Sequence, residues 1–288
     1  MGNATITTRP VSGALGLEVR GVDLAHLNDE LWADLMALWL EHHVLFFPDQ
    51  HLDVDAHIDL ARRFGEPEVH PFTPKLDDDH PEMTVLEGVR ADEWHTDATF
   101  GPTPPMASVV QLVVCPPAGG DTIWTNQELA FATLSPPLQD LLLGLSAVHD
   151  ASPMGRPEIC TVHPAVREHP VTGRRALFVN RGFTSHFVEL QRSESDALLE
   201  MLYRWCERPE LQCRHRWTEG TVGIWDNRCT QHYGVADFSG RRVLHRVTVL
   251  GDRPVGPEPR WPAFEEAGTA AYGKAPVEVD PRTNSLAS

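Results

Sequence analysis

The chain has 288 residues, of which 41% are hydrophobic and 23% are charged, a composition typical of a globular protein with a sizeable core. Its 41 acidic and 24 basic residues give a formal net charge of -17, so its average surface repels nucleic acid and anionic membranes. We therefore expect no nucleic-acid partner and no membrane partner. A local cluster of arginines can still bind a small anion.

The cysteines and the first residues bear on the compartment. The five cysteines are odd in number and form no C-x-x-C pair, which favours neither a disulfide framework nor a zinc knuckle. No apolar run reaches the length of a membrane span, and the first residues contain no apolar signal core. These features predict a cytoplasmic protein without a membrane anchor.

Four segments have the features of helices. Apolar residues recur at helical spacing from Asn28 to His42, where Asn28 or Asp29 is placed to cap the helix. Further helices are expected at about 54–64, from 136 to 145 after Ser135, and from about 193 through Trp205. A buried strand is expected at 44–47, where Pro48 ends it. Other short strands are predicted at 15–22, 83–86, 107–114, 121–124, 176–180, 211–217, 221–225 and 242–250.

Many short strands with a few helices, and no regular strand–helix alternation, predict a mainly β protein with flanking helices (α+β), built as a sandwich or jelly roll. We expect one domain over residues 1–253. Six prolines beyond Gly251 predict that residues 254–288 form an extended or partly disordered tail, which lies on a surface or wraps a neighbouring subunit. The expected assembly is a homo-oligomer, a dimer or tetramer.

Three H-x-D triplets, at 51–53, 57–59 and 95–97, offer pairs of metal ligands. In a strand, residues two apart project from one face, whereas in a helix they diverge by roughly 200°. The first two triplets lie at or inside the helix expected at 54–64, so Asp53 is better explained as a cap, and His57 and Asp59 as solvated or half-buried helix residues. The third, with His95 and Asp97, has β-favouring neighbours, which suits two ligands on one face.

A third ligand must come from elsewhere. His232 stands just past an apolar strand, and two histidines with one carboxylate form the facial set of non-haem iron(II) oxygenases. Taken alone, a histidine such as His232 is more often a hydrogen-bonded core or surface residue. Arg242 and Arg246 share one face of the strand 242–250 and can bind two different anions, although an arginine pair can also be the solvated face of an edge strand.

Seven short pieces of the sequence form a recognisable series. They are VLFF at 44–47, RFG at 63–65, WHTDATF at 94–100, GGDT at 119–122, FVNRGF at 178–183, WDNR at 225–228 through His232, and HRVT at 245–248. In this order the pieces resemble the taurine dioxygenase (TauD/TfdA) family, which includes alkylsulfatases and phenoxyalkanoate dioxygenases. The resemblance runs from about Leu15 to Pro254, and each piece is only moderately specific by itself.

The resemblance implies a double-stranded β-helix that holds Fe(II) through His95, Asp97 and His232. It also implies that Thr122 and Arg242 bind the distal carboxylate of 2-oxoglutarate, for which a hydroxyl and a guanidinium are suitable partners. The implied reaction consumes O₂, converts 2-oxoglutarate to succinate and CO₂, and oxidises, most simply by hydroxylation, a C–H bond of a second substrate.

The resemblance to taurine-type enzymes is partial on the substrate side. Arg246, His70 and Phe183 match the family's substrate residues, which implies an anionic head group beside an apolar body. Thr73 stands where those enzymes have tyrosine, Ala91 stands where they have asparagine, and the segment 150–162 is shorter than their lid loop. We therefore expect a bulkier carboxylate, sulfonate or sulfate ester, lying between Phe183 and residues 85–86.

Two alternatives come from other classes of function. A zinc hydrolase can use the same three ligands with an activated water, but it gives no role to Thr122 and Arg242. A non-catalytic jelly roll with a structural metal would be expected to have lost one of the ligand positions, and here all three are present.

Overall fold

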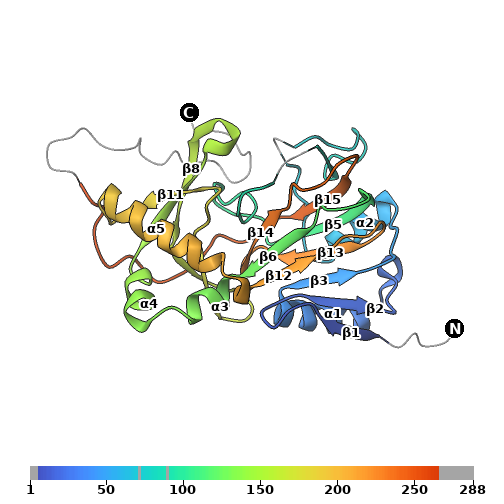
Figure 1. Ribbon diagram of the computed structural model, residues 1–288, viewed down its shortest axis with the longest axis horizontal. Helices are drawn as coiled ribbons and strands as arrows, with labels where there is room; N and C mark the ends of the chain where they lie inside the picture. Colours follow the sequence, from blue (N-terminus) through green and yellow to red (C-terminus); the bar gives the residue numbers. More distant parts are fainter. Residues whose placement is uncertain (1–5, 71–72, 89–90, 266–288) are drawn as a thin grey trace.

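The computed structural model describes residues 6–70, 73–88 and 91–265 of the chain. A large sheet with helices behind it lies beside a smaller lobe that carries most of the remaining helices (Figure 1). No helix among the described residues is long and apolar enough to cross a membrane. The helices are α1 Asp29–His42, α2 Val54–Arg62, α3 Gln127–Ala132, α4 Pro136–Leu142 and α5 Arg192–Cys206.

Within the described residues, the largest sheet has seven strands in the order β1-β2-β3-β13-β5-β15-β4. Most neighbours in it are antiparallel and far apart in the sequence, as β13 is from β3 and β5. The helices α1 and α2 cover one face of this sheet, where Trp39 and Ile58 pack against it. Its central strands β3 and β13 are buried along their whole length. The strand bounds are β1 Thr7–Pro10, β2 Leu17–Arg20, β3 Val44–Phe47, β13 Val222–Asp226, β5 Ala107–Val114, β15 Val243–Val249 and β4 Thr84–Glu87.

A second sheet faces the other side of the large one. Its order is β12-β6-β14, formed by Gln212–His215, Thr122–Asn126 and Thr230–Gly234. Aromatic rings fill the space between the two sheets, among them Phe46 on β3 and Trp124 on β6, whose centroids are 5.2 Å apart. Two facing, mainly antiparallel sheets form the double-stranded β-helix, so the expected fold class is confirmed.

The smaller lobe contains elements that the sequence did not predict. They are α3, a hairpin of β7 and β8 with β11 beside it, and β9, which pairs with β10. β10 itself corresponds to the strand expected at 176–180. The hairpin strand β8 begins and ends with Arg-Pro and His-Pro and is mostly half-buried, so it lacks the alternation that identifies a strand. The bounds are β7 Ser146–Ala151, β8 Arg156–Pro164, β9 Val166–Glu168, β10 Arg175–Leu177 and β11 Thr184–Phe187.

The predicted helices and strands form, with ends shifted by a few residues. The helix expected at 28–42 is α1, and the Asn28 side chain caps it by accepting a hydrogen bond from the backbone N–H of Leu31. Asp53 caps α2 in the same way, as expected. The expectation that His57 is solvated or half-buried was wrong, because its side chain is fully buried and its Nε2 lies 2.9 Å from the carbonyl oxygen of Val109.

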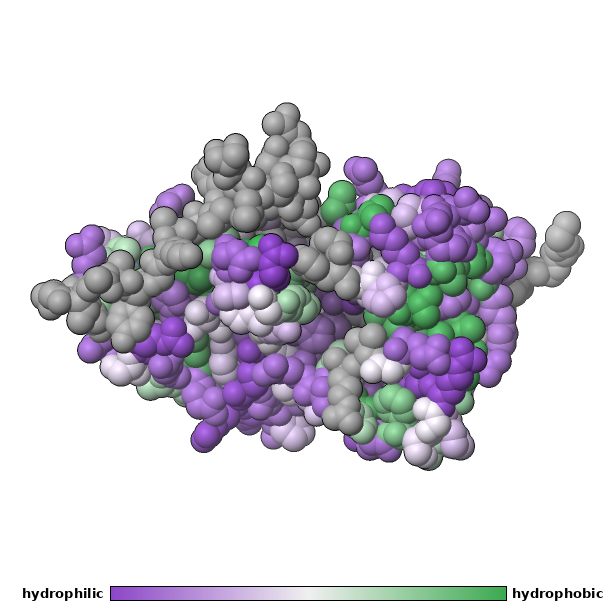
Figure 2. Space-filling model, turned by 90° about the horizontal axis from the view of Figure 1, so that it is seen from above, coloured by the Kyte–Doolittle hydropathy of each residue, from purple (hydrophilic) through white to green (hydrophobic). Residues whose placement is uncertain are grey.

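The described part of the tail, residues 254–265, runs along the smaller lobe. Val255 forms a β-bridge with Glu168, and the backbone N–H of Phe264 donates to the carbonyl of Val188. Residues 266–288 of the predicted tail lie outside the described residues. The face in Figure 2 is mostly hydrophilic, in keeping with the high net charge, and hydrophobic residues show mainly over the part that contains the large sheet.

Candidate active site

The predicted metal ligands meet between the two sheets. His95 lies in the loop between β4 and β5 and forms an isolated β-bridge with His232 on β14, through backbone hydrogen bonds of 3.1 and 2.8 Å. This pairing brings the two imidazole rings to a centroid distance of 4.2 Å. Asp97 begins a turn in which Ala98 has φ of 46°, so the H-x-D triplet lies on a single bridge and a turn and not on the extended strand that was expected.

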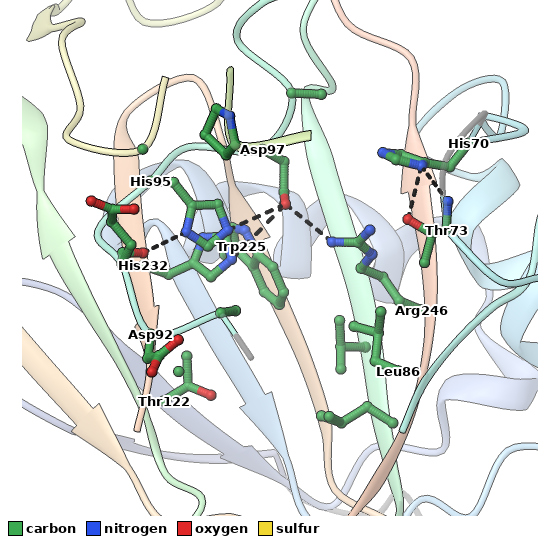
Figure 3. Close-up of a pocket in the computed structure, with 18 of the residues that line it drawn as sticks. His70, Thr73, Leu86, Asp92, His95, Asp97, Thr122, Trp225, His232 and Arg246 are labelled. Carbon is green, nitrogen blue, oxygen red and sulfur yellow. Dashed lines mark hydrogen bonds and ion pairs between the residues drawn. The ribbon is translucent and has the colours of Figure 1, made fainter. Parts of the chain in front are cut away.

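The three ligand atoms fit one ion. His95 Nε2 lies 3.9 Å and His232 Nε2 lies 4.0 Å from Asp97 Oδ1, and all three atoms are within 4.8 Å of one another. Figure 3 shows both imidazoles turned toward Asp97 beside a cavity. Two nitrogens and one carboxylate oxygen on one side of an ion, with a cavity on the other, match the facial donor set of a non-haem iron(II) site.

The protonation states of these groups also suit a metal. The Nδ1 of His95 lies 2.7 Å from the carbonyl oxygen of Glu93, so Nδ1 carries the proton and Nε2 keeps a free lone pair. Burial lowers the pKa of His232 to about 3, which keeps this imidazole neutral. Burial alone would raise the pKa of Asp97, but Arg246 and the two histidines outweigh burial and hold this pKa below its usual range.

A chain of hydrogen bonds fixes the Asp97 carboxylate. Ser108 on β5 donates to Asp97 Oδ2 at 2.8 Å, which leaves Oδ1 to face the histidines. The amide nitrogen of Asn227 lies 3.2 Å from the Ser108 oxygen, and the amide oxygen of Asn227 accepts from Trp225 at 3.0 Å. All four side chains are buried or lie at the cavity wall, so the chain fixes the rotamer of the carboxylate.

We expect Ser108→Ala to weaken divalent-metal binding about tenfold, the lower end of what loss of such a supporting contact costs. The carboxylate would lose the donor that fixes it and could rotate Oδ1 away. Anaerobic calorimetry with Fe(II) or Mn(II) measures the affinity. Thr125→Val is the matched control because Thr125 is a buried hydroxyl that donates to Cys206 away from the site. Unchanged affinity in Ser108→Ala would contradict this role.

The predicted cosubstrate residues line the same cavity, whose volume is about 360 Å³. Thr122 begins β6, and Arg242 comes directly before β15. The Nε of Arg242 donates to the carbonyl of Gly120 at 3.0 Å, which orients the guanidinium. Gly120 has φ of 73°, and a Cβ there would lie 2.9 Å from Arg242, so glycine is required for this close approach.

The predicted substrate residues are also at the cavity wall. Arg246 contacts a metal ligand directly, because its Nη1 donates to Asp97 Oδ1 at 3.1 Å (Figure 3). Burial lowers the pKa of His70 to about 4, and its Nδ1 accepts from the backbone N–H of Thr73 at 3.1 Å, so Nε2 carries the proton. The ring of Phe183 packs edge-on against His95. All eight predicted site residues therefore line one cavity.

The rest of the wall is mostly apolar. Leu86 lines the cavity as expected, but Val85 does not, because alternate residues of β4 point to opposite faces. Met154 comes from the tip of the β7–β8 hairpin, within the segment 150–162 that is shorter than the lid loop of taurine-type enzymes. Thr73 and Ala91 also reach the cavity. The other apolar wall residues are Ala98, Phe100, Val110, Pro153 and Leu244.

Two further groups of metal-ligand types among the described residues share Cys229. His43 bridges Cys229 and Glu128 through its two ring nitrogens, and Arg174 lies 2.8 Å from Glu128. Asp226, the carboxylate of the other group, is bound by the backbone and guanidinium of Arg228 and by His169. These groups are therefore held by hydrogen bonds and by the ion pairs that Arg228 and Arg174 make, and they lie at the turn between β13 and β14.

The chain matches the protein-family model described as taurine catabolism dioxygenase TauD, TfdA family, over residues 7–248. It is 36% identical over 291 aligned residues to the alpha-ketoglutarate-dependent sulfate ester dioxygenase of Pseudomonas putida, which covers 89% of this chain and 96% of that protein. An alkylsulfatase of Acinetobacter baylyi is 35% identical, with 86% of each chain covered.

The fold agrees with solved structures. A taurine dioxygenase from Burkholderia xenovorans superposes with a TM-score of 0.82 at 39% identity, covering 91% of this chain and 96% of that one. The sequence match, the fold and the facial donor set support the same conclusion. This chain belongs to the TauD/TfdA family and is an Fe(II)- and 2-oxoglutarate-dependent dioxygenase.

Proposed function

We propose that His95, Asp97 and His232 hold Fe(II) and are thereby the catalytic residues, and that Thr122 and Arg242 bind the distal carboxylate of 2-oxoglutarate. The observation that supports this proposal is the convergence of residues from separate segments of the chain on one cavity of about 360 Å³. Bound Fe(II) and 2-oxoglutarate supply the oxidation of the C–H bond. The protein binds and orients both substrates, and burial keeps His232 neutral.

We propose further that the second substrate is a sulfate ester of a medium-sized apolar alcohol, with its sulfate at Arg246. Arg246 and the N–H of His70 provide positive charge and a donor, while Phe183, Leu86 and Met154 provide apolar wall. A small zwitterion such as taurine would find few polar partners, because Thr73 and Ala91 offer less than the tyrosine and asparagine of taurine-type enzymes. The sulfate ester and alkyl sulfate relatives support this choice over a carboxylate.

The outcome for a sulfate ester follows from simple chemistry. Hydroxylation of the carbon that bears the sulfate oxygen gives a sulfated hemiacetal, whose C–O bond breaks to release an aldehyde and inorganic sulfate. One O₂ and one 2-oxoglutarate are consumed for each ester, and one succinate and one CO₂ are formed. The protein's part is to hold that carbon toward the ligand face made by His95, Asp97 and His232.

The test uses four six-carbon compounds of similar length: hexyl sulfate, hexanesulfonate, hexanoate and hexanol. We expect hexyl sulfate to give hexanal, sulfate and succinate in equal amounts, and hexanol to give none above background. Taurine is tested in parallel and is expected to be a poor substrate. Hexanol turnover as fast as hexyl sulfate turnover would contradict the anion-binding role. Metal analysis and a requirement for 2-oxoglutarate separate this reaction from zinc-dependent hydrolysis, which would give hexanol and sulfate without O₂.

We also propose, from the sequence alone, a homo-oligomer, a dimer or tetramer, and a cytoplasmic location. Light scattering on the purified protein measures the assembly state.

A further inference from the structure

The hydroxyl of Thr122 has a partner that the sequence did not indicate. Trp217, which follows β12, donates its indole N–H to Thr122 Oγ1 at 2.9 Å. Both side chains are buried, and both line the cavity that contains Arg242. The contact joins residues 95 positions apart, so it depends on the pairing of β12 with β6.

The indole has little freedom to turn. Its ring packs edge-on against His215 at a centroid distance of 5.2 Å, and the ring of Trp124 lies 6.2 Å away. Gly223 on β13 leaves room for it, because a Cβ at that position would lie 2.7 Å from Trp217 Cη2. The direction of the indole N–H is therefore set by the surrounding core.

The chemistry of a hydroxyl determines what this contact does. An indole N–H can only donate, so Thr122 Oγ1 must accept this bond, which leaves the hydroxyl its own proton to donate elsewhere. A threonine side chain can also adopt a rotamer that turns its methyl group toward the cavity. The bond from Trp217 disfavours that rotamer, and a hydroxyl that already accepts one bond donates the next more strongly.

We propose that Trp217 is a positioning residue for the cosubstrate, which acts by holding the Thr122 hydroxyl ready to donate to the distal carboxylate of 2-oxoglutarate. This inference rests on the proposed roles of Thr122 and Arg242. It assigns Trp217 a task beyond core packing, and it gives β12 a part in cosubstrate binding.

The experiment measures 2-oxoglutarate binding by calorimetry to Mn(II)-loaded protein, which avoids turnover because Mn(II) replaces the reactive iron. Trp217→Phe keeps an aromatic ring but removes the donor, and we expect it to raise the Kd about three- to tenfold. Trp124→Phe is the matched control, since the Nε1 of Trp124 is buried and has no hydrogen-bond partner in the described structure. It is expected to leave the Kd within about twofold.

A double-mutant cycle separates positioning from general damage to the core. In a Thr122→Val background, Trp217→Phe is expected to cause no further loss, because there is no hydroxyl left to orient. With 2-oxobutyrate, which lacks the distal carboxylate, wild type and Trp217→Phe should bind alike. Equal losses in Trp217→Phe and Trp124→Phe, or an undiminished loss in the Thr122→Val background, would overturn the inference.

Thr122→Ser tests the idea without touching the core. A serine hydroxyl can still accept the indole bond, so we expect its Kd for 2-oxoglutarate to stay within about twofold of wild type. A serine variant that binds as weakly as Thr122→Val would contradict the proposal. The proposed cosubstrate site itself is wrong if the wild-type protein does not bind 2-oxoglutarate, or if the Thr122→Val variant binds it as tightly as wild type does. These outcomes distinguish a failure of the cosubstrate site from a failure of the role of Trp217.

Discussion

Alanine at His95, Asp97 or His232 is expected to lower 2-oxoglutarate-dependent succinate formation by more than about a hundredfold, since changes outside the ligand set alone cost up to that much. The β-bridge that brings the two histidines together is made by backbone atoms, so it survives loss of either imidazole. The fold should therefore remain, as measured by circular dichroism and thermal unfolding. Succinate formation and metal content are measured on the same preparations.

The three variants are expected to differ in stability. Asp97→Ala leaves the guanidinium of Arg246 in a buried place without its anion, whereas the histidine variants do not. We expect Asp97→Ala to be less stable than His95→Ala by no more than about 3 kcal/mol, the lower end for a broken buried pair, because the cavity admits water. Retained turnover in any one variant would remove that residue from the ligand set.

The sequence singled out His95 and Asp97 as candidate metal ligands because local structure separates the H-x-D triplets. Asp53 and His57 lie at a helix start and inside a helix, where residues two apart diverge. His95 and Asp97 were expected on a strand, but they lie on one bridge and a turn. The two side chains still lie close together, because a turn after an extended residue can also direct both of them to one point. Their distance to His232 could not be calculated from the sequence, since it depends on which strands pair.

Ser108 and Trp217 were missed for a related reason. Ser108 lies in an apolar strand, and strand alternation places it on the same face as Val110, which lines the cavity. This alternation could have indicated that Ser108 faces the cavity, but it does not reveal that Asp97 is its hydrogen-bond partner. In the sequence, Trp217 is the last residue of the strand expected at 211–217, where it looks like an ordinary apolar residue. A donor that acts across 95 positions leaves no local pattern.

The smaller lobe was the least predictable part of the fold. Its hairpin strands β7 and β8 carry histidines and prolines in place of an alternating pattern. Two of these histidines are buried by contacts with distant groups. His149 lies 2.9 Å from the hydroxyl of Thr99, and His163 lies 2.9 Å from the carbonyl oxygen of the same residue. These histidines therefore support the turn that contains Asp97 and Thr99. As polar residues, they also hide the strand pattern that apolar residues would show.

The net charge of -17 makes the two cavity arginines more important for an anionic substrate. An anion approaching the surface is repelled at long range, although salt at 0.15 M screens this repulsion beyond about 8 Å. Inside the cavity the effective dielectric constant is lower, so the attraction of Arg242 and Arg246 for an anion is stronger at contact distance. We expect weak ionic-strength dependence of substrate affinity compared with that of a protein that attracts its substrate by surface charge.

Arg246→Met is expected to lower kcat/KM for hexyl sulfate about 100-fold, because loss of one charge-assisted contact to an anion costs about 1.5–3 kcal/mol and the carbon would also be misplaced. Methionine keeps much of the length of the arginine side chain, so the cavity wall remains. Affinity for 2-oxoglutarate should change little. Metal affinity should stay the same or rise, since a cation 3.1 Å from Asp97 Oδ1 opposes a metal ion at that oxygen.

Arg242→Met is the matched control, and the opposite pattern is expected for it. It should weaken 2-oxoglutarate binding by about 1.5–3 kcal/mol while leaving metal affinity unchanged. Both variants are tested with both anionic ligands. Each arginine is then assigned to the anion whose affinity falls when that arginine is replaced. If Arg246→Met instead weakens metal binding, the contact with Asp97 has a structural role that outweighs its charge. Hexyl sulfate turnover at the wild-type rate in Arg246→Met would show that the substrate anion binds elsewhere, and the apolar wall around Phe183 would then be the only basis left for substrate choice.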